Sequence, residues 1–192
     1  MKFEFTRTAI PGLVVVAPQT GRDERGTFSE QYKASEFRKG GIKDVFVQEN
    51  RSVSRKGVLR GLHFQRPPRA QAKLVRCGHG RVWDVAVDLR RGSRTYGKWF
   101  GLELSRENNL MLYIPEGFAH GFCALTDRAE VIYMCSKEYA PASDSGVRWD
   151  DPRLAVKWPV KKPKISPKDA ALPFLKKGTG CFFPGAGQES AE

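Results

Sequence analysis

The stretch Arg81–Leu89 (RVWDVAVDL) is the clearest β-strand signal in the chain and the main evidence for its fold class. Its residues alternate in strict period two, which sends successive side chains to opposite faces of a sheet. The two sets are Trp83, Val85, Val87 and Leu89 on one face and Val82, Asp84, Ala86 and Asp88 on the other. The first face belongs to a hydrophobic core. The second carries two carboxylates among small residues, which predicts a strand that lines a cavity.

Further strands are expected on both sides of this stretch. After it, apolar runs between short turns predict strands over 98–104, 109–115, 120–125 and 129–136. Before it, one short strand is expected within 6–17 after a Pro-Gly turn and another within 23–30 after a turn at Gly26, and residues 43–54 are expected to be extended. One short helix is expected over 32–40, capped by Ser35 and stopped by Gly40. Regular strands without intervening helices favour an antiparallel sandwich or barrel. The predicted fold class is therefore all-β, with short peripheral helices.

Length and composition predict a single soluble domain. The chain has 192 residues and is 40% hydrophobic, enough to bury a core, and we expect one domain over residues 1–177 and a loose tail over 178–192. The charged N-terminus and the lack of eighteen consecutive apolar residues predict a cytoplasmic protein with no membrane partner. The four cysteines lack metal-binding spacing, so we expect them to be reduced core residues.

The net charge of +12 raises the alternative of nucleic-acid binding. Much of the excess lies in Lys157–Lys177, where prolines interrupt any regular basic helix and no zinc or stacking-aromatic signature is present. A solvated basic surface is the favoured interpretation, and no nucleic-acid partner is expected.

The stretch Gly57–Arg76 (GVLRGLHFQRPPRAQAKLVR) is the best candidate for chemistry. It places Arg60, His63 and Lys73 among apolar strand residues, on two runs that we expect to pair as a hairpin. An isolated strand histidine is usually a hydrogen-bonded structural residue. A guanidinium, an imidazole and an ammonium within fifteen residues instead predict a basic pocket for an anionic substrate. Arg60 and His63 are three apart, and Gly61 permits the bulge that would bring both to one face.

The run Pro115–His120 (PEGFAH) resembles the second half of the cupin signature, whose histidine faces the interior of a jelly roll. In many cupins this histidine binds a metal. Here His63-Phe64-Gln65 offers one imidazole where metal cupins have two, so no metal is expected. A metal-dependent cupin enzyme remains an alternative.

Seven motifs, in order along the chain, resemble those of the dTDP-4-dehydrorhamnose 3,5-epimerase family. They are Asp23-x-Arg25-Gly26-x-Phe28-x-Glu30, Gln48-x-Asn50, Leu59-Arg60-Gly61-Leu62-His63-Phe64-Gln65, Gln71-x-Lys73-Leu74-Val75-Arg76, Asp84-Val85-Ala86-Val87-Asp88-Leu89-Arg90, Arg148-Trp149-x-Asp151-Pro152 and Ser166-x-Lys168-Asp169. The resemblance implies a cupin-type jelly roll (double-stranded β-helix) and a homodimer with exchanged N-terminal strands, without metal or organic cofactor. It also implies epimerisation of dTDP-4-dehydro-6-deoxy-D-glucose at C3 and C5, towards dTDP-rhamnose.

The resemblance also implies catalytic roles. His63 would be the base, with Asp169 as its partner, and Tyr133 would be the acid on the opposite side of the sugar. Both carbons flank the C4 ketone, so removing either proton leaves an enolate with its charge on O4. Lys73 is the candidate to stabilise that charge, with Asp84 holding the ammonium. Ser166, Pro167 and Asp169 also form a helix-start pattern, and both roles of Asp169 are compatible.

Substrate contacts are implied in the same way. Arg60 would contact the diphosphate, and the remaining nucleotide and sugar contacts would come from Arg25, Glu30, Gln48, Asn50 and His120. Arg25, Phe28 and Glu30 are expected to reach the other subunit's pocket. Glu138 stands where many members carry a second aromatic beside Tyr139, at the place associated with the nucleobase. Two alternatives therefore remain open, inversion at C3 or C5 only and another nucleotide. A sugar-nucleotide-binding module without turnover is a further alternative.

Overall fold

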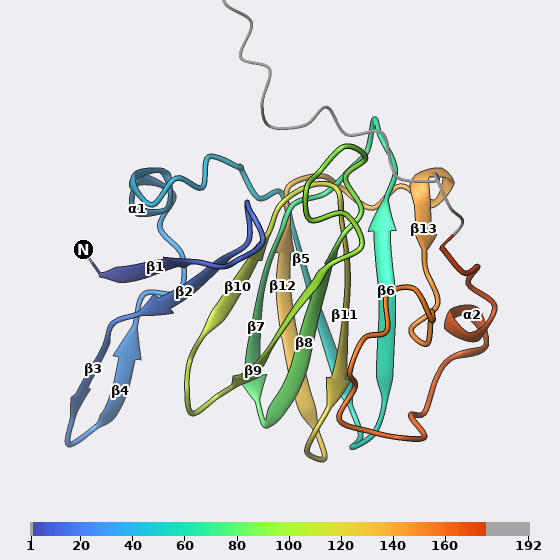
Figure 1. Cartoon of the computed structure of the whole chain (residues 1–192). Coiled ribbons are helices and arrows are strands. Elements are labelled where there is room, and N and C mark those ends of the chain that lie inside the picture. The colour runs from blue at the N-terminus through green and yellow to red at the C-terminus, as the bar shows by residue number, and fades with distance from the viewer. Residues whose placement is uncertain (1, 176–192) are drawn as a thin grey trace, which may run out of the picture.

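The computed structural model of the chain describes residues 2–175, and its framework is two antiparallel β-sheets that face each other (Figure 1). The six-stranded sheet has the order β1 (Phe3–Arg7), β2 (Val14–Pro18), β10 (Met111–Ile114), β7 (Lys73–His79), β12 (Ala129–Cys135) and β5 (Gln48–Ser54). The five-stranded sheet has the order β13 (Asp144–Gly146), β6 (Leu59–Gln65), β11 (Phe118–Ala124), β8 (Arg81–Asp88) and β9 (Trp99–Ser105). The predicted all-β sandwich is confirmed.

The smaller elements lie around these two sheets. A separate hairpin of β3 (Thr20–Asp23) and β4 (Gly26–Ser29) extends away from the sandwich (Figure 1). The helices are α1 (Ala34–Lys39), the 3-10 helix η1 (Pro141–Ser143) and α2 (Pro167–Ala170). All of them are short, as expected for peripheral helices. None of the helices in the described residues is long and apolar enough to span a membrane.

Strand β8 is buried on both faces, which corrects the expectation of a cavity face. Val82 and Ala86 belong to the main core between the two sheets, together with Phe118 and Val131. The opposite face of β8, which includes Val85, packs against the C-terminal segment from Val147 to Leu175 in a second apolar cluster. Burying each large apolar side chain stabilises the fold by about 1.5–3 kcal/mol. The two carboxylates of β8 therefore lie in a closed interior, and each needs a specific polar partner.

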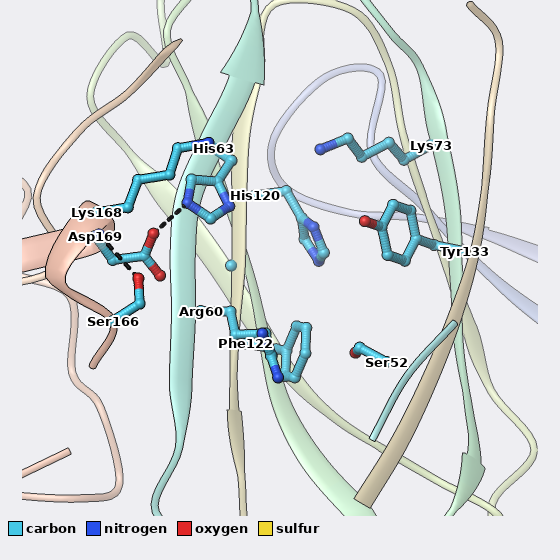
Figure 2. Close-up of a pocket in the computed structure, with 11 residues that line it drawn as sticks. Ser52, Arg60, His63, Lys73, His120, Phe122, Tyr133, Ser166, Lys168 and Asp169 are labelled. Carbon is cyan, nitrogen blue, oxygen red and sulfur yellow. Dashed lines mark hydrogen bonds and ion pairs between the residues drawn. The ribbon is translucent and has the colours of Figure 1, made fainter. Parts of the chain in front are cut away.

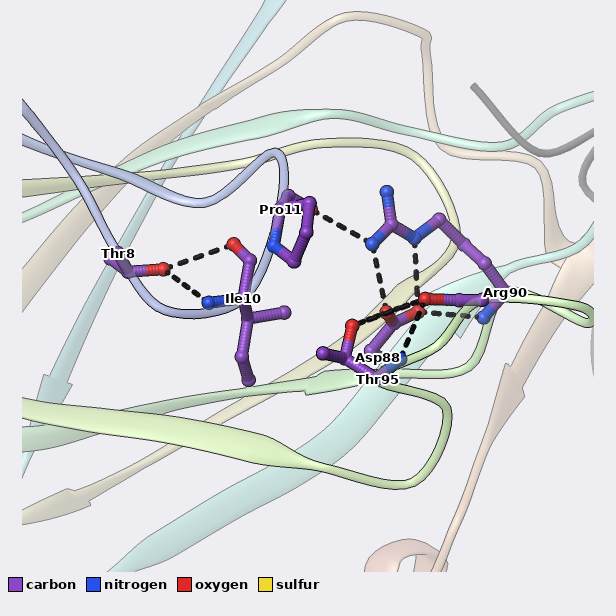
Figure 3. Close-up of polar contacts among 7 residues, drawn as sticks. Thr8, Ile10, Pro11, Asp88, Arg90 and Thr95 are labelled. Carbon is purple, nitrogen blue, oxygen red and sulfur yellow. Dashed lines mark hydrogen bonds and ion pairs between the residues drawn. The ribbon is translucent and has the colours of Figure 1, made fainter. Parts of the chain in front are cut away.

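Asp88 finds its partners in the loop that follows β8 (Figure 3). Its carboxylate accepts hydrogen bonds from Arg90 Nε at 2.9 Å and Nη2 at 2.8 Å, from Ser93 Oγ at 2.6 Å and from Thr95 Oγ1 at 2.7 Å. Burial works to raise the pKa of Asp88, but these hydrogen bonds outweigh it and hold the pKa below the ordinary value. Arg90 Nη2 also donates to Pro11 O at 2.8 Å, so the network ties the end of β8 to the β1–β2 connection.

Helix α1 begins differently from the prediction. Its N-cap is Lys33, which makes no side-chain capping hydrogen bond, and Ser35 lies inside the helix, so the predicted Ser35 cap is wrong. The helix is held instead by Phe37, which is 1% exposed and packs edge-on against Phe3 and Phe5. Gly40 does end the helix, with an ordinary φ of −73°. A Cβ there would come within 2.7 Å of the Phe5 ring, so close packing explains this glycine.

Most of the predicted strands are present, and the largest difference is at 43–54, where the strand begins only at Gln48. Cys77, Cys123 and Cys135 are buried free thiols. Cys181 and the predicted tail over 178–192 lie outside the described residues. The single domain over 1–177 stays a prediction.

Candidate active site

A pocket between the two sheets collects the predicted catalytic side chains (Figure 2). His63 on β6 and Asp169 on α2 form one wall, and Lys73 on β7 and Tyr133 on β12 form the opposite wall, with the His120 ring between them. The strands that carry the two walls belong to different sheets. The predicted hairpin between the two halves of Gly57–Arg76 is therefore wrong, because β6 pairs with β11 and β13 whereas β7 pairs with β10 and β12.

His63 and Asp169 are in direct contact. His63 Nε2 lies 2.7 Å from Asp169 Oδ1, and Asp169 Oδ2 accepts a hydrogen bond from the Gly61 backbone N–H at 3.3 Å. Ser166 Oγ caps α2 by accepting from the Asp169 N–H at 3.0 Å, so the capping pattern and the contact with His63 coexist. Burial raises the pKa of Asp169, but the hydrogen bonds from His63, Gly61 and Ser166 lower it overall. Asp169 is therefore an anion that orients the imidazole.

Lys73 and Tyr133 are adjacent on the other wall. Lys73 is 9% exposed, its Nζ lies 5.8 Å from the centre of the Tyr133 ring, and the ammonium points into the pocket (Figure 2). Burial lowers the pKa of Lys73, although nearby acidic groups work against the shift. Burial also raises the pKa of Tyr133, so its phenol is neutral at neutral pH and can donate a proton.

Asp84 does not hold Lys73, which corrects the prediction. Its Oδ2 lies 2.9 Å from His120 Nε2, and the two side chains are 0% and 7% exposed. Asp84 therefore fixes the ring orientation of His120, and it affects Lys73 only as one of the more distant charges that raise its pKa. Within the described part of the chain, no side chain hydrogen-bonds Lys73 Nζ.

Gly61 brings Arg60 and His63 to the same pocket. Its φ is +122°, and the register between β6 and β11 shifts at this point. A Cβ at this position would lie 2.6 Å from Gly121 Cα and 2.8 Å from His120 O. Only glycine fits there, and the irregular strand places both side chains at the pocket, as the sequence predicts. Arg60 Nε donates to Ser54 Oγ at 3.1 Å, which orients the guanidinium.

The pocket continues past Lys73 and Tyr133 into a second part, which we call the Tyr139 side. Gln48 and Asn50 line it from β5, and Gln48 Nε2 donates to Asn50 Oδ1 at 3.0 Å. Gln48 Oε1 accepts from the Tyr139 backbone N–H at 2.7 Å, and Tyr139 OH donates to Asp144 Oδ2 at 3.2 Å. Glu138 is exposed and is not among the residues that line the pocket of its own chain, and its contact with substrate stays a prediction.

Arg25, Phe28 and Glu30 also lie away from the pocket of their own chain. Arg25 Nη2 pairs with Asp23 Oδ2 at 2.6 Å on the β3–β4 hairpin, and Phe28 on the same hairpin is 75% exposed. Glu30 Oε1 pairs with Lys2 Nζ at 3.1 Å.

Lys168 is a pocket residue that has no role predicted from the sequence. It lines both parts of the pocket, and its Nζ donates to Asp144 Oδ2 at 2.6 Å. Its place beside Asp169 in the Ser166-x-Lys168-Asp169 motif is the signal that could have identified it. Among the described residues, no group of three or more histidine, cysteine, aspartate or glutamate side chains could hold a metal ion.

Comparison with known proteins gives the family. The family model described as dTDP-4-dehydrorhamnose 3,5-epimerase matches residues 7–177. The chain belongs to this family. A dTDP-4-dehydrorhamnose 3,5-epimerase of Salmonella typhimurium is 49% identical over 171 residues, covering 88% of this chain and 93% of the relative. The resemblance predicted from the seven motifs is thereby confirmed.

Two further members of the epimerase family bear on the site. The crystal structure of a dTDP-6-deoxy-D-glucose-3,5-epimerase from Legionella pneumophila, in complex with dTDP-4-keto-L-rhamnose, is 45% identical with a TM-score of 0.86, covering 90% of this chain and 92% of that one. A dTDP-4-dehydrorhamnose 3-epimerase of Streptomyces niveus is 44% identical over 161 residues, covering 83% of this chain and 78% of the relative. The structural match confirms the predicted cupin-type jelly roll.

Proposed function

We propose that this chain catalyses the epimerisation of dTDP-4-dehydro-6-deoxy-D-glucose at C3 and C5, giving dTDP-4-dehydro-L-rhamnose for dTDP-rhamnose biosynthesis. The observation that carries the proposal is the pair of opposed walls, with the His63–Asp169 pair facing Tyr133 and Lys73 across one pocket (Figure 2). The name of the Salmonella relative and the sugar nucleotide in the Legionella structure support the same reaction.

His63 acts as the general base. Its Nε2–H donates to Asp169 Oδ1, which leaves the lone pair of Nδ1 free to take a proton. The protons on C3 and C5 are acidic because both carbons lie next to the C4 ketone. A positioned base typically contributes about 10² to 10⁴-fold in rate. The anionic Asp169 then stabilises the imidazolium that forms.

Lys73 stabilises the enolate. Loss of either proton moves negative charge to O4, and a buried ammonium on the facing wall is a strong partner for it because little water screens the pocket. The lowered pKa of Lys73 also makes the ammonium a better proton donor than a solvent-exposed lysine.

Inversion requires a second proton-transfer group on the other side of the ring. If His63 returned the proton that it removes, the carbon would exchange with solvent without inverting. Tyr133 is a neutral phenol on the opposite wall, and it delivers the proton that inverts the centre. Arg60 contacts the diphosphate, and Gln48, Asn50, His120 and Tyr139 contact the rest of the substrate.

The active form is a homodimer that exchanges N-terminal strands. The β3–β4 hairpin pairs only with itself among the described strands, and β5 forms an edge of the six-stranded sheet, with Val53 49% exposed. A second copy's hairpin placed along this edge would cover Phe28 and bring Arg25 towards Gln48 and Asn50.

Mixing two defective variants tests the exchange. In a mixed dimer of Arg25→Ala and His63→Asn chains, one pocket would hold both native side chains, so activity should recover to at most about a quarter of wild type. Recovery should not occur if Arg25 serves the pocket of its own chain.

The function is tested by incubating the protein with dTDP-4-dehydro-6-deoxyglucose in deuterated water and following both ring positions by NMR. We expect deuterium at C3 and C5, with the product in the L-rhamno configuration. Deuterium at one carbon alone would indicate a single-centre epimerase, as the name of the Streptomyces niveus relative describes. Binding of dTDP without exchange would indicate a binding module, and activity lost to chelators would indicate a metal-dependent enzyme.

A further inference from the structure

Three glutamine side chains hold the backbone of the segment that follows β12, Lys137–Ala140. They come from distant places in the sequence, namely β5, β6 and the residue two before β7. The contacts are Gln48 Oε1 with Tyr139 N at 2.7 Å, Gln65 Oε1 with Ala140 N at 2.7 Å, Gln65 Nε2 with Glu138 O at 3.3 Å and Gln71 Nε2 with Lys137 O at 2.7 Å. All three glutamines line the Tyr139 side of the pocket. The segment contributes Tyr139 to the lining of this side of the pocket and is held through its main chain, and we call it the wall.

Gln65 is the central contact. It is 4% exposed, and its Nε2 also donates to Arg69 O at 2.6 Å, so its oxygen accepts one hydrogen bond and its nitrogen donates two. A primary amide offers one carbonyl acceptor and two N–H donors, and here all of these functions are engaged. A neutral imidazole has one donor and one acceptor and could not satisfy the same three backbone groups. This explains why Gln65 stands where metal cupins place a second histidine.

We propose that Gln65 is a positioning residue that sets substrate affinity by holding the Lys137–Ala140 wall against the Tyr139 side of the pocket. The inference rests on the proposed function, since it assigns this side to the part of the sugar nucleotide that extends beyond the catalytic groups. Because Gln65 touches only main-chain atoms of the wall, the side chains there can vary without moving it. Glu138, whose side chain is exposed, replaces an aromatic without loss of the wall.

The test compares Gln65→Glu with the wild type. Glutamate has the same length but loses both N–H donors and places a carboxylate against Arg69 O and Glu138 O. We expect the Kd for dTDP, measured by calorimetry, to rise about 10-fold or more, the equivalent of roughly 1.4 kcal/mol. KM should rise in parallel, whereas kcat at saturating substrate should stay within about 3-fold, because the wall does not touch the reacting atoms. Gln71→Ala removes a single contact with the wall, and we expect a rise in Kd of about 3-fold.

Asn108→Ala is the matched control. Asn108 also makes three side-chain hydrogen bonds to the backbone, with Ser105 N and Leu110 N at 3.0 Å and Glu103 O at 2.9 Å, but it is not among the residues that line the pocket. The Asn108→Ala variant should have a lower Tm than the wild type and the same Kd for dTDP.

The proposal is overturned if Gln65→Glu binds dTDP as the wild type does, or if kcat falls while Kd and KM stay constant. If Gln65→Glu does not fold, Gln71→Ala decides, and an unchanged Kd for that variant refutes the proposal. A wild type that binds dTDP but exchanges no ring proton would refute the proposed function instead, and the comparison of dTDP affinities would still test the wall.

Discussion

Replacing Asp169 with asparagine should disable His63 by changing its tautomer. Asp169 presents one oxygen to each of two donors, His63 Nε2 at 2.7 Å and Gly61 N–H at 3.3 Å. Asparagine has only one oxygen. Because the Gly61 amide can only donate, it claims that oxygen, and the asparagine NH₂ then faces His63. The imidazole must accept at Nε2 and carry its proton on Nδ1, where the lone pair is needed for catalysis.

The size of the effect follows from these contacts. The reversed asparagine rotamer would restore the active tautomer but would set NH₂ against the buried Gly61 N–H, at a cost of about 1–3 kcal/mol. At room temperature this leaves the productive rotamer at roughly 0.6–16% of the population, a loss of about 6- to 160-fold. The variant also lacks the negative charge that stabilises the imidazolium. Together we expect proton exchange to fall by about 10² to 10⁴-fold.

The assay is deuterium incorporation at C3 and C5, measured by NMR for Asp169→Asn and the wild type. Helix α2 should persist, because Ser166 Oγ caps it through the backbone N–H of residue 169. Asp150→Asn makes the same chemical change at a partly exposed ion pair with Arg148 and should keep wild-type exchange. If Asp169→Asn retains more than about a tenth of wild-type exchange, Asp169 does not set the tautomer of His63, since even the smallest expected general-base effect is larger.

Two further variants separate activity from stability. Lys73→Met should reduce turnover by about 10² to 10³-fold, as for the loss of one oxyanion contact. The same change removes a buried ammonium whose pKa is lowered by burial. The free energy of unfolding at pH 7, measured with urea, should therefore stay unchanged or rise by up to about 2 kcal/mol. A lower free energy of unfolding would contradict this expectation. Asp88→Asn should lower the free energy of unfolding at pH 7 by about 3–5 kcal/mol, because it breaks a buried pair with Arg90. Since the folded-state pKa of Asp88 is lowered, its contribution is present above the ordinary value of 3.8 and is lost as the pH falls through the folded-state pKa. The difference between wild type and variant should therefore shrink in acid, and a constant difference would show that the carboxylate charge is irrelevant.

The strands could be predicted from the sequence because their pattern is local. The alternation in Arg81–Leu89 and the β-branched and apolar runs of 98–136 each report on one strand, and period two needs no knowledge of the neighbours. The role of Gly61 could also be interpreted locally, because only glycine allows the irregular strand that places Arg60 and His63 at one pocket.

Long-range pairing could not be predicted in this way. The two halves of Gly57–Arg76 are close in sequence and joined by a Pro-Pro turn, yet they belong to opposite sheets, because the sandwich directs consecutive strands across its core. The partner of Asp84 depends on the register of β8 with β11, which places His120 within reach and Lys73 on the other sheet. The Ser35 cap failed because packing of Phe37 outweighs capping in so short a helix.

The role of Gln65 depends on the same long-range geometry. Its two partners in the wall lie more than seventy residues away in the sequence, so no local pattern identifies them. The motif Leu59–Gln65 marks the residue, but only the folded chain shows what it contacts.

In the proposed mechanism a base and an acid act from opposite walls of one pocket, and the Tyr133→Phe variant separates their contributions. The measurement is the ratio of deuterium exchange to net inversion, with dTDP-4-dehydro-6-deoxyglucose in deuterated water. Phenylalanine keeps the ring that packs against the core and removes only the phenol proton. We predict that exchange through His63 continues while inversion falls steeply, most clearly at C5, so the ratio rises. A ratio equal to that of the wild type, with both rates merely reduced together, would contradict the account and make Tyr133 a packing residue.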